Sequence, residues 1–466
     1  MANWTSSLAS LALLLTAVAI VISRLPQVDL GHTPAFKRRR FFNWFPLGLT
    51  YAFLYFGRYN LSAVQPELER LHILTKKEFG DIDGMGALVY GLAFLLNGPL
   101  ADRWGGRATI LLSAAGSAVA NVMTAYVFSA ATDGAIDAKS LPSILMITNA
   151  VNMYFQSFGA VSIVKVNAPW FHVRERGVLG GVFGILISLG LYFAYDWTPA
   201  LFRSIQSVPA LFLIPAATLA LFFVIDFVLV KDSPSAANHR DFDTGDADYD
   251  DSATPSLLTI ARRMFSQRVI WIIVAIEFCS GFLRQAVMKW GRAYAKDVGV
   301  ASDFVFSNWG IVTCVAGILG GVFAGSISDH VFGSRRGPVV SVLYGGLCIG
   351  AVAAVFALGT SGIGWVVALL SLCVIGVHGM LSGTASADFG GKKGAGMATG
   401  IIDGFVYLGT ALQAFIYGRM LPKDLAAKDP SNWTSWPLTM IPVAVLGFVL
   451  ALKLWNARPN QRASSH

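Results

Sequence analysis

The sequence predicts an all-α polytopic membrane protein, with twelve membrane-spanning helices in two six-helix bundles and an extra N-terminal helix. Of its 466 residues, 55% are hydrophobic and only 13% are charged, with a mean hydropathy of +0.59. A soluble protein has about 25% charged residues. Apolar runs repeatedly reach about 20 residues, the length of a helix that crosses a bilayer. The third observation is that the two halves of the chain repeat the same features.

The first apolar stretch covers residues 6–23. A cleaved signal peptide carries positive charge before its apolar part. Here no Lys or Arg precedes the stretch, whereas Arg24 and the basic run 37–40 follow it. We therefore expect residues 1–42 to form an uncleaved helix and a basic cytoplasmic segment, with a signal peptide as the alternative.

Twelve further spans are expected in two sets of six. The first set covers 43–65, 82–101, 108–130, 143–166, 177–200 and 208–230, and the second covers 270–292, 304–328, 337–358, 363–386, 396–420 and 436–456. The segment between them is acidic and lacks apolar periodicity, which is typical of a solvated linker. The predicted domains are thus the bundles 43–230 and 269–466, joined by a cytoplasmic linker at 231–268.

The charges of the loops predict the orientation of the chain in the membrane, and the absence of certain motifs excludes several kinds of protein. With residues 24–42 in the cytoplasm, most loop lysines and arginines fall on that side, as the positive-inside rule requires. We expect a multi-pass protein of the plasma or inner membrane. The sequence shows no nucleotide-binding loop, catalytic triad, metal-ligand spacing or basic nucleic-acid patch. It therefore predicts a monomer that is not an enzyme, with no cofactor, no metal and no nucleic-acid partner.

Each half carries one arginine within an apolar run. Arg58 lies in the first expected span, and Tyr51 and Tyr55 share its helix face at seven and three residues before it. Arg284 lies in the first span of the second half. A charge at mid-bilayer costs roughly 2.5–3.5 kcal/mol and normally marks a substrate or ion path. The pair predicts a binding site for a small anion.

A second feature recurs at nearly the same offset. Arg58 and Arg284 are 226 positions apart, and Asp102 and Asp329, each in the loop after a second span, are 227 apart. Two features at one offset indicate an internal duplication. Parallel six-helix repeats with a midplane site between them are typical of the major facilitator superfamily of secondary transporters, which this chain resembles.

The loop Gly98-x-x-x-Asp102-Arg103-x-Gly105-Gly106-Arg107 resembles the signature of that superfamily between spans two and three. Its glycines permit close approach, and its aspartate can cap a helix or bond an arginine. The resemblance implies a cytoplasmic gate that can open and close. The residues assigned to this gate are Asp102, Arg103, Arg107 and Asp329.

Within the superfamily the chain resembles a divergent member of the organophosphate:phosphate antiporters, which carry glycerol phosphate and hexose phosphates. The matching motifs are Tyr51, Tyr55, Arg58, Asn60 and Pro66; Arg284, Trp290 and Tyr294; Trp170, Arg174, Glu175, Arg176 and Gly177; and Lys392, Lys393, Gly396, Gly400, Tyr407 and Gly409. The resemblance implies that Arg58 and Arg284 share the phosphate, because guanidinium groups fork across its oxygens. It also implies that Tyr51, Tyr55, Tyr90 and Tyr407 line the cavity.

Other family positions differ, with Phe94, Ile187 and Lys289 where the family often has a lysine, a histidine and an acid. New polar residues appear in the spans instead. Lys289 and Asp403 either pair with each other or contact the substrate, and His378 either carries a proton or bonds a neighbouring helix. Gln156 is a further candidate for substrate contact. An acid partner for the arginines, such as Glu277 for Arg284, is the alternative to anion binding.

Together these features predict a secondary active antiporter in the lipid bilayer that moves a phosphorylated or other anionic small organic molecule by alternating access. The predicted substrate-binding residues are Arg58, Arg284, Tyr51, Tyr55, Tyr90, Gln156, Lys289, His378, Asp403 and Tyr407. Two alternatives stay open. One is a proton-coupled transporter of another solute, and the other is a sugar-phosphate sensor of the same fold that does not transport.

Overall fold

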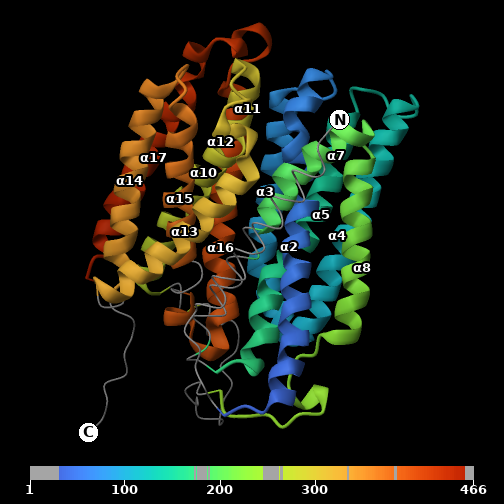
Figure 1. Ribbon diagram of the computed structural model, residues 1–466, viewed down its shortest axis with the longest axis vertical. Coiled ribbons are helices and arrows are strands. Elements are labelled where there is room, and N and C mark those ends of the chain that lie inside the picture. Colours follow the sequence, from blue (N-terminus) through green and yellow to red (C-terminus); the bar gives the residue numbers. More distant parts are fainter. Residues whose placement is uncertain are drawn as a thin grey trace. The chain divides into compact units, whose positions relative to one another are not determined.

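The computed structural model describes residues 31–172, 175, 186, 189–244, 262, 266–332, 335–381 and 386–456 (Figure 1). Within these ranges, the side chains at 102, 322–323, 325–326, 328–330 and 386–399 are not described. The predicted N-terminal helix, the first part of the expected span at 177–200 (all of 177–188 except 186) and the middle of the linker lie outside the described residues.

The described residues form helices and contain no strand, which confirms the all-α prediction. Eight helices among them are long and apolar enough to cross a membrane. They cover Lys76–Ala101, Gly106–Thr132, Ala210–Leu229, Arg268–Val298, Arg336–Ala357, Ile363–Leu381, Gly400–Met420 and Pro430–Lys453. Each overlaps a span expected from the sequence, because about 20 apolar residues are what a helix needs to cross the hydrocarbon layer.

The chain packs as two compact units. Unit 1 contains the described parts of Met1–Leu74, Leu100–Asp246 and Asn308–Val315. Its helices are α2 (Pro34–Arg70), α4 (Gly106–Thr132), α5 (Leu141–Asn167), the π-helical turn η3 (Phe193–Trp197), α7 (Thr198–Ile205) and α8 (Ala210–Leu229). Helix α4 packs against α5 and α8, and α2 packs against α8 and α5.

Helix α2 begins earlier than the sequence predicted, at Pro34 rather than near residue 43. The Thr33 hydroxyl accepts a 3.3 Å hydrogen bond from the Phe36 N–H, and proline suits the first helical turn. Tertiary contacts hold the basic residues that follow. Arg39 donates to the Leu229 carbonyl at 2.7 Å, and Arg40 forms a 3.0 Å ion pair with Glu175.

Unit 2 contains the described parts of Thr75–Pro99, Ala247–Ser307 and Ala316–His466. Its helices include α10 (Arg268–Met288), α11 (Trp290–Val298), α14 (Arg336–Ala357), α15 (Ile363–His378), α16 (Ser386–Met420) and α17 (Ser435–Lys453). Helix α10 is central, since it packs against α15, α16 and α17. Helix α13 (Trp309–His330) begins in unit 1 and continues into unit 2.

Glycines let α10 and α16 approach backbone to backbone. A Cβ atom at Gly281 would lie 1.9 Å from the Val406 carbonyl oxygen, and one at Gly409 would lie 2.0 Å from the Phe278 oxygen. No real Cβ atom tolerates such distances. Small residues at a crossing are a common means of packing membrane helices, because hydrophobic burial drives association weakly in lipid.

Helix α3 (Lys76–Trp104) precedes the linker in sequence, yet its residues up to Pro99 pack within unit 2. Its glycines face α16. A Cβ atom at Gly80 would lie 2.7 Å from the Ala414 oxygen, and one at Gly91 would lie 2.7 Å from the Gly404 oxygen. Helices α3 and α16 therefore touch through their backbones at points eleven residues apart on α3.

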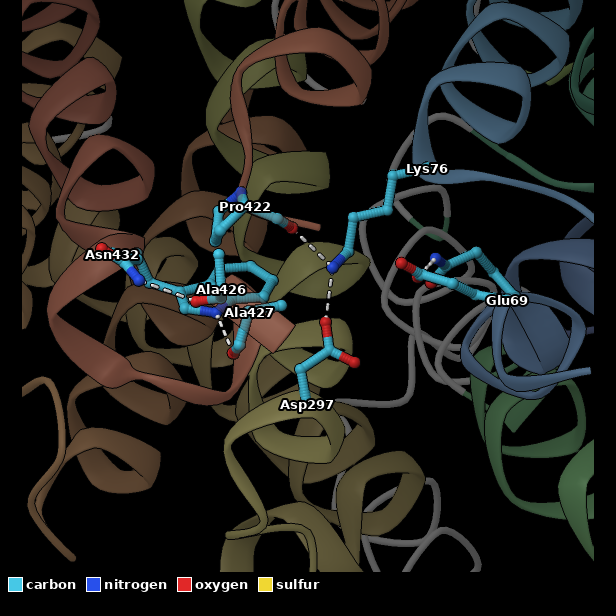
Figure 2. Close-up of polar contacts among 9 residues, drawn as sticks. Glu69, Lys76, Asp297, Pro422, Ala426, Ala427 and Asn432 are labelled. Carbon is cyan, nitrogen blue, oxygen red and sulfur yellow. Dashed lines mark hydrogen bonds and ion pairs between the residues drawn. The ribbon is translucent and has the colours of Figure 1, made fainter. Parts of the chain in front are cut away.

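A buried lysine anchors the start of α3 (Figure 2). The Lys76 side chain is 0% exposed, and its ammonium lies 2.6 Å from an Asp297 carboxylate oxygen on α11. It also donates to the Pro422 carbonyl at 2.7 Å and lies 5.0 Å from the centre of the Trp433 ring. One turn further along α3, Asp81 pairs with Arg419 of α16 at 2.7 Å. Charge pairing therefore reinforces the glycine contact.

We expect Gly281→Ala to destabilise the protein, because its methyl group would force α10 and α16 apart. Overpacking of this kind costs roughly 1–3 kcal/mol. Thermal unfolding in detergent measures the effect. Gly321→Ala is the matched control, since a Cβ atom there would have nothing within 4 Å. Alanine favours a helix over glycine by roughly 0.5–1 kcal/mol, so the control should hold or gain stability. Equal losses in both variants would contradict the close approach.

Lys76→Met should lower the unfolding temperature strongly, because it leaves Asp297 without its ion-pair partner. Breaking a buried pair from one side costs roughly 3–5 kcal/mol. Lys77→Met is the control, since the neighbouring lysine is exposed and the charge change is the same. A double-mutant cycle with Asp297→Asn should show the two losses to be strongly non-additive. Additive losses would mean that the interaction between Lys76 and Asp297 does not contribute to the stability of the protein.

Candidate functional site

Gln156 holds the first buried arginine in unit 1. Arg58, on α2, is 4% exposed, and its Nε and Nη2 atoms donate to the Gln156 side-chain oxygen at 3.2 and 3.1 Å. The Gln156 amide in turn donates to the Leu54 carbonyl at 2.9 Å. One side chain of α5 thus ties the guanidinium to the α2 backbone. Gln156 orients Arg58, a role that the sequence analysis, which assigned it to the substrate, did not foresee.

Two of the predicted tyrosines join this cluster. The Arg58 Cζ atom lies 4.5 Å from the centre of the Tyr55 ring, a cation–π distance. The Tyr51 and Tyr55 rings meet edge to face, with centroids 5.4 Å apart. The structure therefore brings together Arg58, Tyr55, Tyr51 and Gln156, from two helices of unit 1. A positive group framed by an amide and aromatic rings is suited to bind an anion.

An asparagine network behind Arg58 ties three helices together. The side-chain amides of Asn121 on α4 and Asn152 on α5 both donate to the Gly57 carbonyl, at 3.2 and 2.9 Å. Asn60 donates to the Asn121 side-chain oxygen at 2.8 Å. These bonds fix the α2 backbone beside Arg58. Asn60, a motif residue in the sequence, is thus part of the network that holds this backbone in place.

The second arginine lies beside a cluster of aromatic rings in unit 2. Arg284, on α10, is 8% exposed, and its Cζ atom lies 5.7 Å from the centre of the Tyr407 ring of α16. The Tyr407 ring is 4.0 Å from that of Tyr90 on α3, centroid to centroid. Phe94, one turn further along α3, packs against Tyr90 at 4.9 Å. Three predicted site residues from three helices are therefore neighbours.

Lys289 forms a hydrogen-bonded ion pair with Asp83 of α3. Both side chains are largely buried. Asp403 was the expected partner of Lys289, and the sequence did not predict the pair with Asp83. The two residues are 206 positions apart, and no local pattern relates them. The pair is a further link between α3 and the end of α10.

Glu277 and His378 meet inside unit 2. The fully buried Glu277 carboxylate lies 3.3 Å from the His378 Nδ1 atom at the end of α15. Arg284 lies close enough to interact electrostatically with both groups, and Asp403 with His378. Glu277 was expected only as a partner for Arg284, and the sequence did not link it to His378. An acid in an apolar run was the signal that pointed to Glu277.

At the predicted gate, the described residues show how the signature loop is held. Arg107 donates to the Phe227 carbonyl at 2.6 Å, and its backbone N–H donates to the Asp232 carboxylate at 2.8 Å. Gly105 has φ of +86°, and a Cβ atom there would lie 3.0 Å from Asp232, so both conformation and space favour glycine. Asp232 therefore caps α4 from the start of the linker. Arg103 is exposed, and the side chains of Asp102 and Asp329 lie outside the described residues.

The chemistry available is that of guanidinium, ammonium, carboxylate, imidazole and phenol groups. In the part of the chain that the structure describes, no group of three or more His, Cys, Asp or Glu residues is arranged to hold a metal ion. Two buried arginine clusters, one in each unit, are the features best suited to bind a negatively charged molecule.

Comparisons with known proteins place the chain in a family. The model of the Major Facilitator Superfamily matches residues 47–414. The glycerol-3-phosphate transporter of Bacillus subtilis is 26% identical over 450 residues, covering 91% of this chain and 94% of that protein. The membrane sensor protein UhpC of Salmonella typhimurium is 23% identical over 424 residues, covering 88% and 90%.

A solved structure shows the same fold. It is that of a bacterial homolog of the human lysosomal transporter Spinster, in an inward-facing and unoccupied conformation. It aligns with a TM-score of 0.63 over 91% of this chain and 97% of that one, at 14% identity. At this identity the likeness supports the fold alone.

These matches agree with the resemblance to organophosphate:phosphate antiporters. The matched relatives are described as a transporter and a membrane sensor, which supports the prediction that the chain is not an enzyme. The family model spans most of the chain, and the described helices have the length and composition of membrane spans. This chain is a multi-pass integral protein of the cell membrane and belongs to the Major Facilitator Superfamily.

Proposed function

We propose that this protein is a secondary active antiporter that exchanges a phosphorylated small organic anion across the membrane by alternating access. The observation that carries the proposal is the presence of one buried arginine in each unit, Arg58 and Arg284. The relative named as a glycerol-3-phosphate transporter supports a phosphate ester as the cargo. Arg58 and Arg284 bind the anionic group of the substrate.

The setting of Arg58 suits this role. Gln156 and the Tyr55 ring orient the guanidinium, and because both are neutral, neither contact removes its positive charge. A guanidinium presents parallel N–H donors that match two oxygens of a phosphate. Holding a charge in the membrane is costly, so an arginine retained there is expected to serve a ligand or an ion.

The setting of Arg284 adds aromatic surface. The rings of Tyr407 and Tyr90 pack beside it, and their phenol groups can donate hydrogen bonds to the body of an organic phosphate. Asp403, His378 and Lys289 lie in the same unit and supply further polar groups for the substrate. Such a mixed lining is common in sites for small polar organic molecules.

A sensor is the second candidate, because one of the relatives is named a membrane sensor protein. A sensor of this fold would bind the same anion without carrying it across the membrane. Counterflow in liposomes separates the two, since a transporter exchanges internal for external substrate and a sensor binds without flux. Glycerol 3-phosphate, hexose phosphates, phosphonates and carboxylates form the test panel.

Arg58→Lys and Arg284→Lys should each abolish counterflow of the best phosphate ester. An ammonium keeps the charge but cannot reproduce the two parallel donors of a guanidinium. Arg70→Lys is the control, because Arg70 is exposed and pairs only locally with Glu67. Unchanged affinity and flux in either buried variant would refute its assignment to the anion.

Gln156→Glu should weaken phosphate binding far more than Gln156→Ala. The glutamate has the same shape as glutamine, yet its carboxylate would pair with Arg58 and compete with the substrate. Alanine only removes the bond that orients the guanidinium, so we expect a loss of about tenfold, the equivalent of one hydrogen bond to a charged group. Substrate affinity in detergent measures both. A smaller loss with glutamate than with alanine would contradict an anion at Arg58.

A further inference from the structure

A buried carboxylate in α10 touches a histidine that is partly accessible. The Glu277 side chain is 0% exposed, whereas the His378 side chain is 25% exposed. The carboxylate oxygen Oε2 lies 3.3 Å from Nδ1 of the imidazole. The imidazole thus connects an acid inside the helix bundle with less buried surroundings, an arrangement through which a proton can reach the acid.

The groups around this pair come from several helices. On α10 itself, Arg284 lies within electrostatic range of both members, and Ser280 and Cys279 flank Glu277. Helix α16 contributes Asp403, and α14 contributes Tyr344, whose hydroxyl donates to the Ile276 carbonyl at 2.7 Å. Helix α17 carries no titratable side chain before Lys453. The remaining titratable side chains on these helices are Arg268, Arg336, Cys348, Cys373, Asp388, Lys392, Lys393, Tyr407, Tyr417 and Arg419.

The Glu277–His378 pair can hold different numbers of protons. A carboxylate and an imidazole that share one proton are together neutral, and a second proton makes the pair positive. Arg284 is the fixed positive charge nearby, and it opposes the second proton because like charges repel. An anion bound at Arg284 offsets this repulsion, since the local charge then falls.

We propose that Glu277 and His378 form a proton-binding site whose occupancy is coupled to an anion bound at Arg284. The proton comes from water, enters through the imidazole and is shared with the carboxylate, and no other bond changes. By linkage, if the anion promotes protonation, then protonation must tighten anion binding by the same factor. The coupling rests on the proposed function, because it needs an anionic substrate at Arg284. The protein would then carry a proton together with its anion.

Proton uptake on substrate binding tests the coupling directly. The purified protein is kept in weakly buffered detergent with a pH-indicating dye. It is mixed with a glycerol 3-phosphate solution of the same pH, once below and once above neutrality. The wild type should take up protons in excess of those that the buffer and phosphate account for. Glu277→Gln and His378→Gln should both lose this uptake, and Glu277→Gln should still bind substrate. Glu67→Gln, a carboxylate removed outside the pair, should behave as the wild type.

Infrared difference spectra test the proton site without any substrate. A pH titration of the wild type should show the carbonyl stretch of a protonated carboxylic acid that Glu277→Gln removes and Glu67→Gln keeps. His378→Gln should shift the pH at which that band appears, whereas a purely structural contact would leave the band in place. Glu277→Asp is the second variant, since it keeps an acid at the position if the glutamine variant fails to fold.

The outcomes separate the two proposals. If the infrared band depends on Glu277 but no phosphate ester binds, the proton site is supported and the proposed substrate class is wrong. If glycerol 3-phosphate is exchanged but no proton uptake occurs, the coupling is overturned and the antiporter assignment is unaffected. If no band depends on Glu277, the proton site itself is overturned.

Discussion

The cost of holding charge inside a hydrocarbon layer decides how the ionisable side chains in the spans of this chain are arranged. Arg58 is bonded by a glutamine, Lys289 pairs with Asp83, and Glu277 meets His378. Each contact lowers the penalty that an isolated charge would carry. These contacts also hold helices against one another, because the two partners of each contact come from different helices. The same residues are the candidates for function, since charged side chains retained in membrane spans usually serve a substrate or an ion.

The fold followed from the sequence wherever the governing rule is local. Apolar runs of membrane-crossing length located helices such as α4, α8 and α14 to within a few residues of their observed ends. Helix α2 was predicted too short because an apolar run ends where charged residues begin. Its basic first turns are helical through tertiary bonds, such as the one from Arg39 to the Leu229 carbonyl, which a hydropathy pattern does not contain.

The site followed from the sequence in part, for the same reason. Tyr51, Tyr55 and Arg58 lie on one helix, and their spacing alone predicts that they are neighbours. The partners of Glu277 and Lys289 are 101 and 206 positions away, so spacing says nothing about them. Resemblance pointed to residues expected to contact a substrate but did not say which residues orient them. Gln156 shows the difference, since its bonds are to the protein itself.

Helix α3 has a consequence for how the polypeptide is assembled. By chain order it belongs to the first repeat, but Lys76, Asp83 and its glycine face find their partners on helices made after the linker. During synthesis α3 is therefore made before α10, α11 and α16, the helices that carry these partners. A chain cut in the linker would separate α3 from them. The two fragments would have to associate to restore these contacts.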